Sequence, residues 1–224
     1  MPHDPVHPAA PRALRYLALG DSYTIGEGVA PGGSWPMQLA RALRDEGLPV
    51  ADPQVIATTG WTTDELDAAI DTAAPADDFD LASLLIGVNN QYRGRGLAEY
   101  REQFAALLER AIGFAGGDAG RVFVLSIPDW GVTPFAASSD RDVAAIAREL
   151  DAFNAAAAGL SRQRGVAFVD ITPASRALGA QARMLAEDGL HPSAAMYGQW
   201  TALTLPVARG LLQPSVAQVQ QRPV

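Results

Sequence analysis

A serine near the start of the chain, together with a histidine and an aspartate near its end, could form a nucleophilic site. In "YLALGDSYTIGEGV", residues 16–29, an apolar run gives way to Asp21 and Ser22. A serine hydroxyl is a weak nucleophile that needs an adjacent base, and that base needs a partner to orient it. Of the three histidines, two lie in the Pro- and Ala-rich start of the chain, so His191 is the candidate base. Asp188, three residues earlier, is the candidate for the orienting carboxylate.

Gly60 and Asn89 could supply the hydrogen-bond donors that such a site also needs. The tetrahedral intermediate of acyl transfer carries an oxyanion, which N–H groups stabilise. Gly60 leaves its backbone N–H open to approach, and Asn89 offers a side-chain amide. Taken separately, each residue has an ordinary structural interpretation, because glycine is common in turns and asparagine caps helices. Their occurrence together with Ser22, Asp188 and His191 favours catalysis.

The elements that must position these residues alternate along the chain. Short apolar runs, typical of strands buried on both faces, lie at 15–20, 53–58, 80–87, 121–127 and 166–171. Helical patterns fall between and after them, at 34–47, 62–74, 97–115, about 141–164 and 192–211. This alternation predicts an α/β fold in which helices cover both faces of a parallel sheet. Ligands bind such sheets at the carboxyl ends of the strands, which is where the candidate residues fall.

Four sequence blocks carry a resemblance to a known family. The chain resembles the SGNH hydrolases of the GDSL esterase/lipase type over about residues 14–210, through Ser22 in "GDSYTIGEG", Gly60 in "ATTGWTTDEL", Asn89 in "IGVNN" and His191 in "DGLHPS". The resemblance implies that Ser22 is the nucleophile and His191 the general base, oriented by Asp188. It also implies an oxyanion hole made of the Ser22 and Gly60 N–H groups and the Asn89 amide.

The same resemblance implies the architecture, which is a flavodoxin-like, three-layer α/β/α sandwich around a five-stranded parallel sheet. Many family members have aspartate after the asparagine of the third block, where this chain has Asn90. That departure concerns local hydrogen bonding, since the position is not one of the four marker residues.

Several further residues could contact a substrate. Asp21, Trp61, Asn90 and Tyr92 lie beside the marker residues, although for Asp21 a structural role as the cap of a turn is favoured. The segment 127–136, "IPDWGVTPFA", is expected to form a wall of the site. Two other aromatic residues could line a groove or pack in the core, namely Tyr23 and Trp35.

Composition and charge exclude several other classes of function. A formal net charge of −8 argues against a nucleic-acid surface, which needs clustered basic residues. The chain has no cysteine, and the acidic stretch 76–80 lacks the ligand spacing of a calcium loop. No glycine-rich phosphate-binding loop follows the first strand, so neither a metal nor a cofactor is expected. Without an apolar segment of the length that a signal peptide or a membrane span needs, the sequence predicts a cytoplasmic protein without stable membrane insertion.

The expected organisation is a flexible arm over 1–13, one hydrolase domain over 14–211 and a loose tail over 212–224. The expected activity is hydrolysis of a small carboxylic ester with a short acyl chain, through an acyl-enzyme intermediate. An acyltransferase or a sugar O-deacetylase using the same residues remains an alternative, as does a non-catalytic flavodoxin-like binding module. Across the family, lysophospholipase, thioesterase and arylesterase activities share one scaffold, so the substrate and the oligomeric state stay open.

Overall fold

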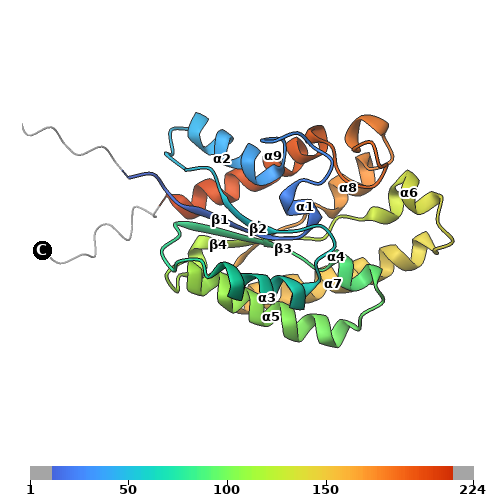
Figure 1. Ribbon diagram of the computed structural model, residues 1–224, viewed down its shortest axis with the longest axis horizontal. Coiled ribbons are helices and arrows are strands. Elements are labelled where there is room, and N and C mark those ends of the chain that lie inside the picture. The colour runs from blue at the N-terminus through green and yellow to red at the C-terminus, as the bar shows by residue number, and fades with distance from the viewer. Residues whose placement is uncertain (1–11, 214–224) are drawn as a thin grey trace, which may run out of the picture.

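Residues 12–213, which the computed structural model describes, contain a five-stranded parallel sheet in the order β2-β1-β3-β4-β5 (Figure 1). The strands are β1 (Tyr16–Gly20), β2 (Gln54–Ala57), β3 (Leu81–Leu85), β4 (Val122–Leu125) and β5 (Ala167–Val169). Gly20 at the end of β1 lies in register with Ala57 of β2 and with Leu85 of β3. These three strands end at one level, so the loops that follow them begin side by side. The predicted parallel sheet and α/β class are confirmed.

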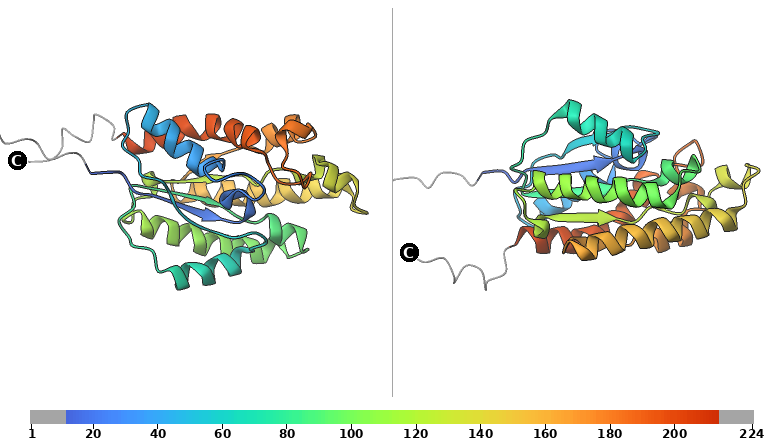
Figure 2. Two further views of the ribbon diagram at one scale, coloured as in Figure 1. Left: turned by 45° about the horizontal axis from the view of Figure 1, so that its top comes forward. Right: turned by 90° about the horizontal axis from the view of Figure 1, so that it is seen from below.

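Two layers of helices enclose the sheet (Figure 1). One face is covered by α2 (Trp35–Asp45) and α9 (Ala194–Leu212), and the other by α3 (Thr63–Ala73), α5 (Leu97–Phe114) and α7 (Val143–Gln163). Short helices gather at the end to which the strands point (Figure 2): α1 (Ser22–Ile25), α4 (Val88–Tyr92), α6 (Pro134–Ala137) and α8 (Thr172–Leu178). Three 3₁₀ segments within residues 12–213 complete the fold, Ala119–Arg121, Trp130–Val132 and Ala182–Met184. The long helices were predicted, and the short ones were not.

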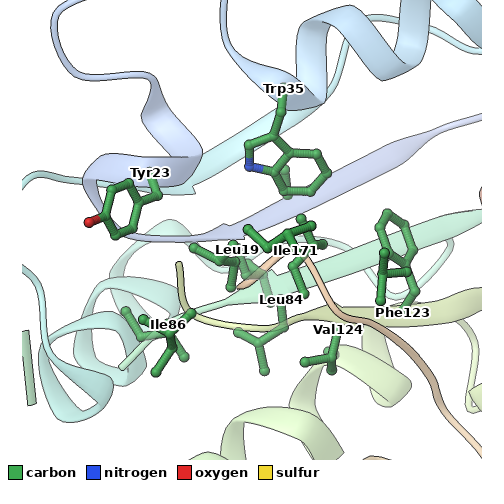
Figure 3. Packing of buried hydrophobic residues seen from close by; sticks show 14 of the residues in the cluster. Leu19, Tyr23, Trp35, Leu84, Ile86, Phe123, Val124 and Ile171 are labelled. Atoms are coloured by element: carbon green, nitrogen blue, oxygen red, sulfur yellow. The ribbon is translucent and has the colours of Figure 1, made fainter. Parts of the chain in front are cut away.

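The core lies on both sides of the central strands. All residues of β1, β3 and β4 are buried. Trp35, at the start of α2, is fully buried and meets the ring of Phe123 edge-on at 6.2 Å between centroids (Figure 3). Leu19 and Leu84 belong to the same cluster. Of the two roles considered for Trp35, the structure therefore supports packing in the core and not the lining of a groove.

The ends of the described segment are tied to the domain. Arg12, predicted to belong to the flexible arm, forms hydrogen bonds of 2.6 and 2.8 Å with the carboxylate of Asp80. Leu212, predicted to belong to the tail, is the last residue of α9. The remainder of the predicted arm and tail, 1–11 and 214–224, lies outside the described residues. Among the helices of residues 12–213, none combines the length and the apolar character needed to cross a membrane.

Candidate active site

Ser22 lies at the first position of α1, directly after β1. A Cβ on Gly20 would clash with the side chain of Thr24 and with the carbonyl oxygen of Leu85. Only glycine therefore lets α1 pack against the end of the strand. This close approach leaves Ser22 with 4% of its surface exposed, at the carboxyl edge of the sheet.

Asp21 supports α1 and does not lie among the residues that line the cavity described below. Its side chain is fully buried, and one carboxylate oxygen accepts the N–H of Tyr23 at 3.0 Å, which caps the helix. Burial raises the pKa of Asp21 to about 7. The possible substrate contact predicted for Asp21 is thus not supported, because the side chain is used to cap α1.

Gly60 follows β2 in a conformation that favours glycine, with φ of +89°. Its carbonyl oxygen accepts a hydrogen bond from the Arg93 guanidinium at 2.6 Å, and Arg93 is also paired with Glu65 at 3.2 Å. The N–H groups of Gly60 and Ser22 donate no hydrogen bond to any other atom of residues 12–213. Both donors are therefore free to bind a ligand.

Asn89 and Asn90 are neighbours in α4 but make different contacts. The Asn89 amide donates one hydrogen bond to the Trp61 carbonyl at 2.9 Å, which leaves its second N–H free, because an amide nitrogen carries two. Asn90 is fully buried, accepts the backbone N–H of Thr63 at 3.1 Å and donates to the Thr63 hydroxyl at 2.7 Å. Asn90 therefore holds the start of α3, and its predicted contact with a substrate is not supported.

These contacts also explain why asparagine suits position 90. The Thr63 hydroxyl donates its hydrogen to Gln103, so it can only accept a hydrogen bond from residue 90. An amide can donate that bond, whereas an ionised carboxylate cannot. The departure from the family pattern thus matches the hydrogen bonding found here.

His191 and Asp188 form a direct pair within one loop. Nδ1 of His191 lies 2.5 Å from one carboxylate oxygen of Asp188, and the other oxygen accepts the backbone N–H groups of Leu190 and His191, both at 2.9 Å. Partial burial would raise the pKa of Asp188, but these hydrogen bonds from His191 and Leu190 outweigh it and lower the pKa below its usual value. An ionised Asp188 requires the proton of a neutral imidazole on Nδ1, which leaves Nε2 as an acceptor.

The loop that carries this pair is closed by backbone hydrogen bonds. Ala186 N–H donates to the His191 carbonyl at 2.8 Å, and Ser193 N–H donates to the Met184 carbonyl at 2.9 Å. Ser193 then caps α9, which begins at Ala194 and not at Pro192 as predicted, since Pro192 forms an antiparallel bridge with residue 185. The loop geometry is therefore fixed on both sides of His191.

A cavity of about 220 Å³ brings the marker residues together. Its polar lining includes Ser22, Gly60, Asn89 and His191. Its remaining lining consists of Thr59 and the largely apolar side chains of Tyr23, Val88, Tyr92, Trp130, Phe135 and Leu190. The residues that line this one small space thus carry a hydroxyl, a base whose ring is oriented by a carboxylate, and three N–H donors. This arrangement can attack a carbonyl carbon and stabilise the oxyanion that results.

The sequence profile of the GDSL-like lipase/acylhydrolase family matches residues 18–199, which is most of the chain. The chain belongs to this family. The predicted resemblance is therefore confirmed, and the protein is a hydrolase of the esterase and lipase type.

Solved structures show the same fold at low sequence identity. TesA is 21% identical, with a TM-score of 0.65 over 88% of this chain and 99% of that one. A lipase/acylhydrolase from Enterococcus faecalis is 21% identical, with a TM-score of 0.67 over 90% and 99%. Axe2, an acetylxylan esterase from Geobacillus stearothermophilus, is 19% identical, with a TM-score of 0.64 over 87% and 94%. No curated protein sequence matches the chain.

The predicted substrate contacts divide into those at the cavity and those away from it. In this GDSL-family hydrolase, Tyr92 lines the cavity, and so do Trp130 and Phe135 from the segment expected to form a wall. Trp61 instead lines a separate groove between β2 and α3, with Val55 and residues of α3, so its side chain is not placed to touch a substrate held at Ser22. Its backbone carbonyl, which accepts from the Asn89 amide, is the part that reaches the site.

Three lining residues were not predicted, although each adjoins a predicted one. Thr59 precedes Gly60, Val88 precedes Asn89 and Leu190 precedes His191. Their position next to marker residues at strand ends was the available signal. No group of three His, Asp or Glu side chains within residues 12–213 is arranged as a metal site would require.

Proposed function

We propose that this GDSL-family hydrolase is a serine esterase that cleaves carboxylic esters with short acyl chains through an acyl-enzyme intermediate. The observation that carries the proposal is the 2.5 Å pair between His191 and Asp188 at the cavity that also contains Ser22, Gly60 and Asn89. A binding module would not need a carboxylate to orient an imidazole beside a hydroxyl.

In the first half of the reaction, the Ser22 oxygen attacks the ester carbonyl carbon while Nε2 of His191 takes the hydroxyl proton. The oxyanion receives hydrogen bonds from the N–H groups of Ser22 and Gly60 and from the free N–H of Asn89. Collapse of the intermediate breaks the bond to the alcohol oxygen, and His191 returns the proton to that oxygen. The alcohol leaves, and the acyl group stays bound to Ser22.

Water completes the cycle by attacking the acyl carbonyl while His191 again takes a proton. The bond to Ser22 then breaks, the serine oxygen is reprotonated, and the carboxylic acid leaves. Asp188 stays ionised throughout, holding the imidazole in one orientation and stabilising it when it carries a positive charge. The lowered pKa of Asp188 supports this role, because its carboxylate is charged over the pH range in which a histidine base works.

The size of the cavity supports a small acyl group. Sites for drug-sized ligands enclose about 300–1,000 Å³, whereas this cavity has about 220 Å³. Axe2, one of the solved structures of similar fold, is an acetylxylan esterase. Removal of acetyl groups from sugars is therefore a second candidate function, and acetylated xylan belongs among the substrates to be tested.

Hydrolysis of p-nitrophenyl esters from acetyl to decanoyl tests the proposal. Ser22→Ala should fall to background, while Ser34→Ala, a buried serine whose side chain does not cap its helix, should retain activity. A fluorophosphonate probe should label the wild type and Ser34→Ala but not Ser22→Ala. Activity equal to wild type in folded Ser22→Ala would refute the assignment of the nucleophile. Product analysis with a competing alcohol separates hydrolysis from acyl transfer.

A further inference from the structure

The apolar side of the catalytic cavity ends at a wall that has open space behind it. A second hollow, of about 20 Å³, lies beyond Tyr23, Trp130 and Leu190, and these three residues line both spaces. Their side chains therefore form a partition between the two. A space of this size accommodates about one water molecule, so it is a packing defect and not a second site.

The lining of the second hollow includes two side chains that can rearrange. These are Met184 and Met196, and Trp200 also lines this hollow. Methionine is unbranched and polarisable, so it adapts to a change in its neighbours at low cost. The space behind the partition could thus enlarge if one of the three dividing side chains were shortened.

Two of the three dividing side chains are held rigidly. The Trp130 indole N–H donates to the side-chain oxygen of Gln91 at 2.8 Å, and the Gln91 amide donates to Glu149 at 2.7 Å. Tyr23 is 3% exposed and stands edge-on to the rings of both His191 and Trp200, with centroids 5.9 Å away in each case. The depth of the cavity is therefore fixed by the fold before a substrate enters.

The outer edge of Trp130 is covered as well. The Arg141 guanidinium lies over the Tyr92 ring at 4.2 Å and within 5.7 Å of the Trp130 ring, and it donates to the Tyr92 carbonyl at 2.7 Å. Phe135 stands edge-on to Trp130 at 6.2 Å. Trp130 cannot swing outward without breaking these contacts, so its ring holds the depth of the cavity at a fixed value.

We propose that this partition, made by Tyr23, Trp130 and Leu190, terminates the acyl subsite and is the feature that restricts the enzyme to short-chain acyl groups. This inference rests on the proposed esterase function and adds to it the residues that set the acyl length. An acyl chain bound to Ser22 lies along the apolar wall and stops at the partition. Longer chains have to leave apolar contact or displace a buried ring.

Leu190 is the member best suited to a test, because its side chain is half-buried while its backbone N–H holds Asp188. Leu190→Ala removes only side-chain atoms and should open the partition between the two spaces. One methylene in a hydrophobic pocket changes kcat/KM by roughly 10–200-fold. The ratio of kcat/KM for the decanoyl ester to that for the acetyl ester should therefore rise by about tenfold or more in Leu190→Ala. A ratio is used so that any general loss of activity cancels.

Trp130→Phe is a second variant that shortens the same wall, and it should shift the ratio in the same direction. Leu203→Ala is the matched control, since Leu203 is 42% exposed on α9 and lines neither space. An unchanged ratio in whichever of Leu190→Ala and Trp130→Phe is folded would overturn the proposal. The proposal would also be overturned if these variants changed the relative kcat/KM among alkyl acetates of increasing alcohol length and not among esters of increasing acyl length. The wall would then contact the alcohol part of the ester.

Failure of this proposal can be told apart from failure of the proposed function. If Ser22→Ala abolishes hydrolysis but Leu190→Ala and Trp130→Phe keep the wild-type profile, the enzyme is a serine esterase whose acyl length is set elsewhere. If no ester is hydrolysed, or if hydrolysis does not depend on Ser22, the esterase function itself is refuted, and this inference is refuted with it.

Discussion

Replacing Arg93 with methionine should slow catalysis without weakening substrate binding. The Arg93 guanidinium donates to the Gly60 carbonyl at 2.6 Å, and the same glycine carries a backbone N–H assigned to the oxyanion hole. Methionine keeps an unbranched apolar stem like that of arginine, but it is shorter and cannot donate a hydrogen bond. Oxyanion donors are effective because they are fixed before the reaction begins, so a less constrained Gly60 should be a poorer donor.

The expected loss is smaller than that from removing a donor, which costs about 10²–10³ in turnover. Arg93 only orients the donor, and its side chain is 42% exposed, so water can replace part of the bond. The net contribution of such a hydrogen bond is ~0.5–1.5 kcal/mol. This corresponds to a fall in kcat of about two- to twelvefold, with KM unchanged because the interaction strengthens only in the transition state.

Steady-state kinetics on p-nitrophenyl acetate would measure both constants, with thermal unfolding recorded for each variant. Arg95→Met is the matched control, because Arg95 pairs with Asp64 and Glu99 and does not contact Gly60. Arg93→Lys should recover part of the lost kcat, since an ammonium can also donate to the carbonyl. If kcat is unchanged while KM rises, Arg93 contacts the substrate instead, and the positioning argument is wrong. If kcat fell equally in Arg93→Met and Arg95→Met, the cause would be the loss of a positive surface charge and not the loss of the hydrogen bond to Gly60.

Three other substitutions give distinct outcomes. Asp188→Asn presents an amide N–H to Nδ1 of His191 and favours the wrong tautomer, so kcat should fall by about 10⁴ in steady-state assays without loss of fold by circular dichroism. Because burial raises the pKa of Asp21 to about 7, its ionised form destabilises the fold at high pH. Asp21→Asn should therefore raise the melting temperature at pH 8.5, with a gain that shrinks as the pH falls through 7 and vanishes below about 4. Asn90→Asp cannot donate to the Thr63 hydroxyl and should lower the free energy of unfolding in urea by about 1–3 kcal/mol.

The sequence predicted the long elements because their patterns extend over enough residues to be recognised. Each of the five strands lies within its predicted range, and α2, α3, α5 and α7 agree with their predicted helices to within about two residues at each end. The short helices were not predicted, since their four to seven residues complete only one or two turns and show too little periodicity. They matter nonetheless, because α1 and α4 carry Ser22 and Asn89 into the cavity.

Sequence position predicted which edge of the sheet each candidate residue would reach, but not the direction of its side chain. Asn89 and Asn90 were both expected at the site, yet successive residues of a helix point about 100° apart. Asn89 therefore faces the cavity, whereas Asn90 binds Thr63. Trp61 shows the same limitation, since only its carbonyl reaches the site while its ring lies in another groove.

The two halves of the site depend on different kinds of contact, and this explains why one was easier to recognise than the other. The pair of Asp188 and His191 is formed within a single loop, by groups three residues apart. Gly60, by contrast, is held by Arg93 across 33 residues, and Asn89 reaches the Trp61 carbonyl across 28. A local pair can be inferred from spacing alone, because its geometry follows from one turn. The oxyanion half exists only once β2 and β3 are packed on β1, so its geometry is a property of the folded sheet and not of any short motif.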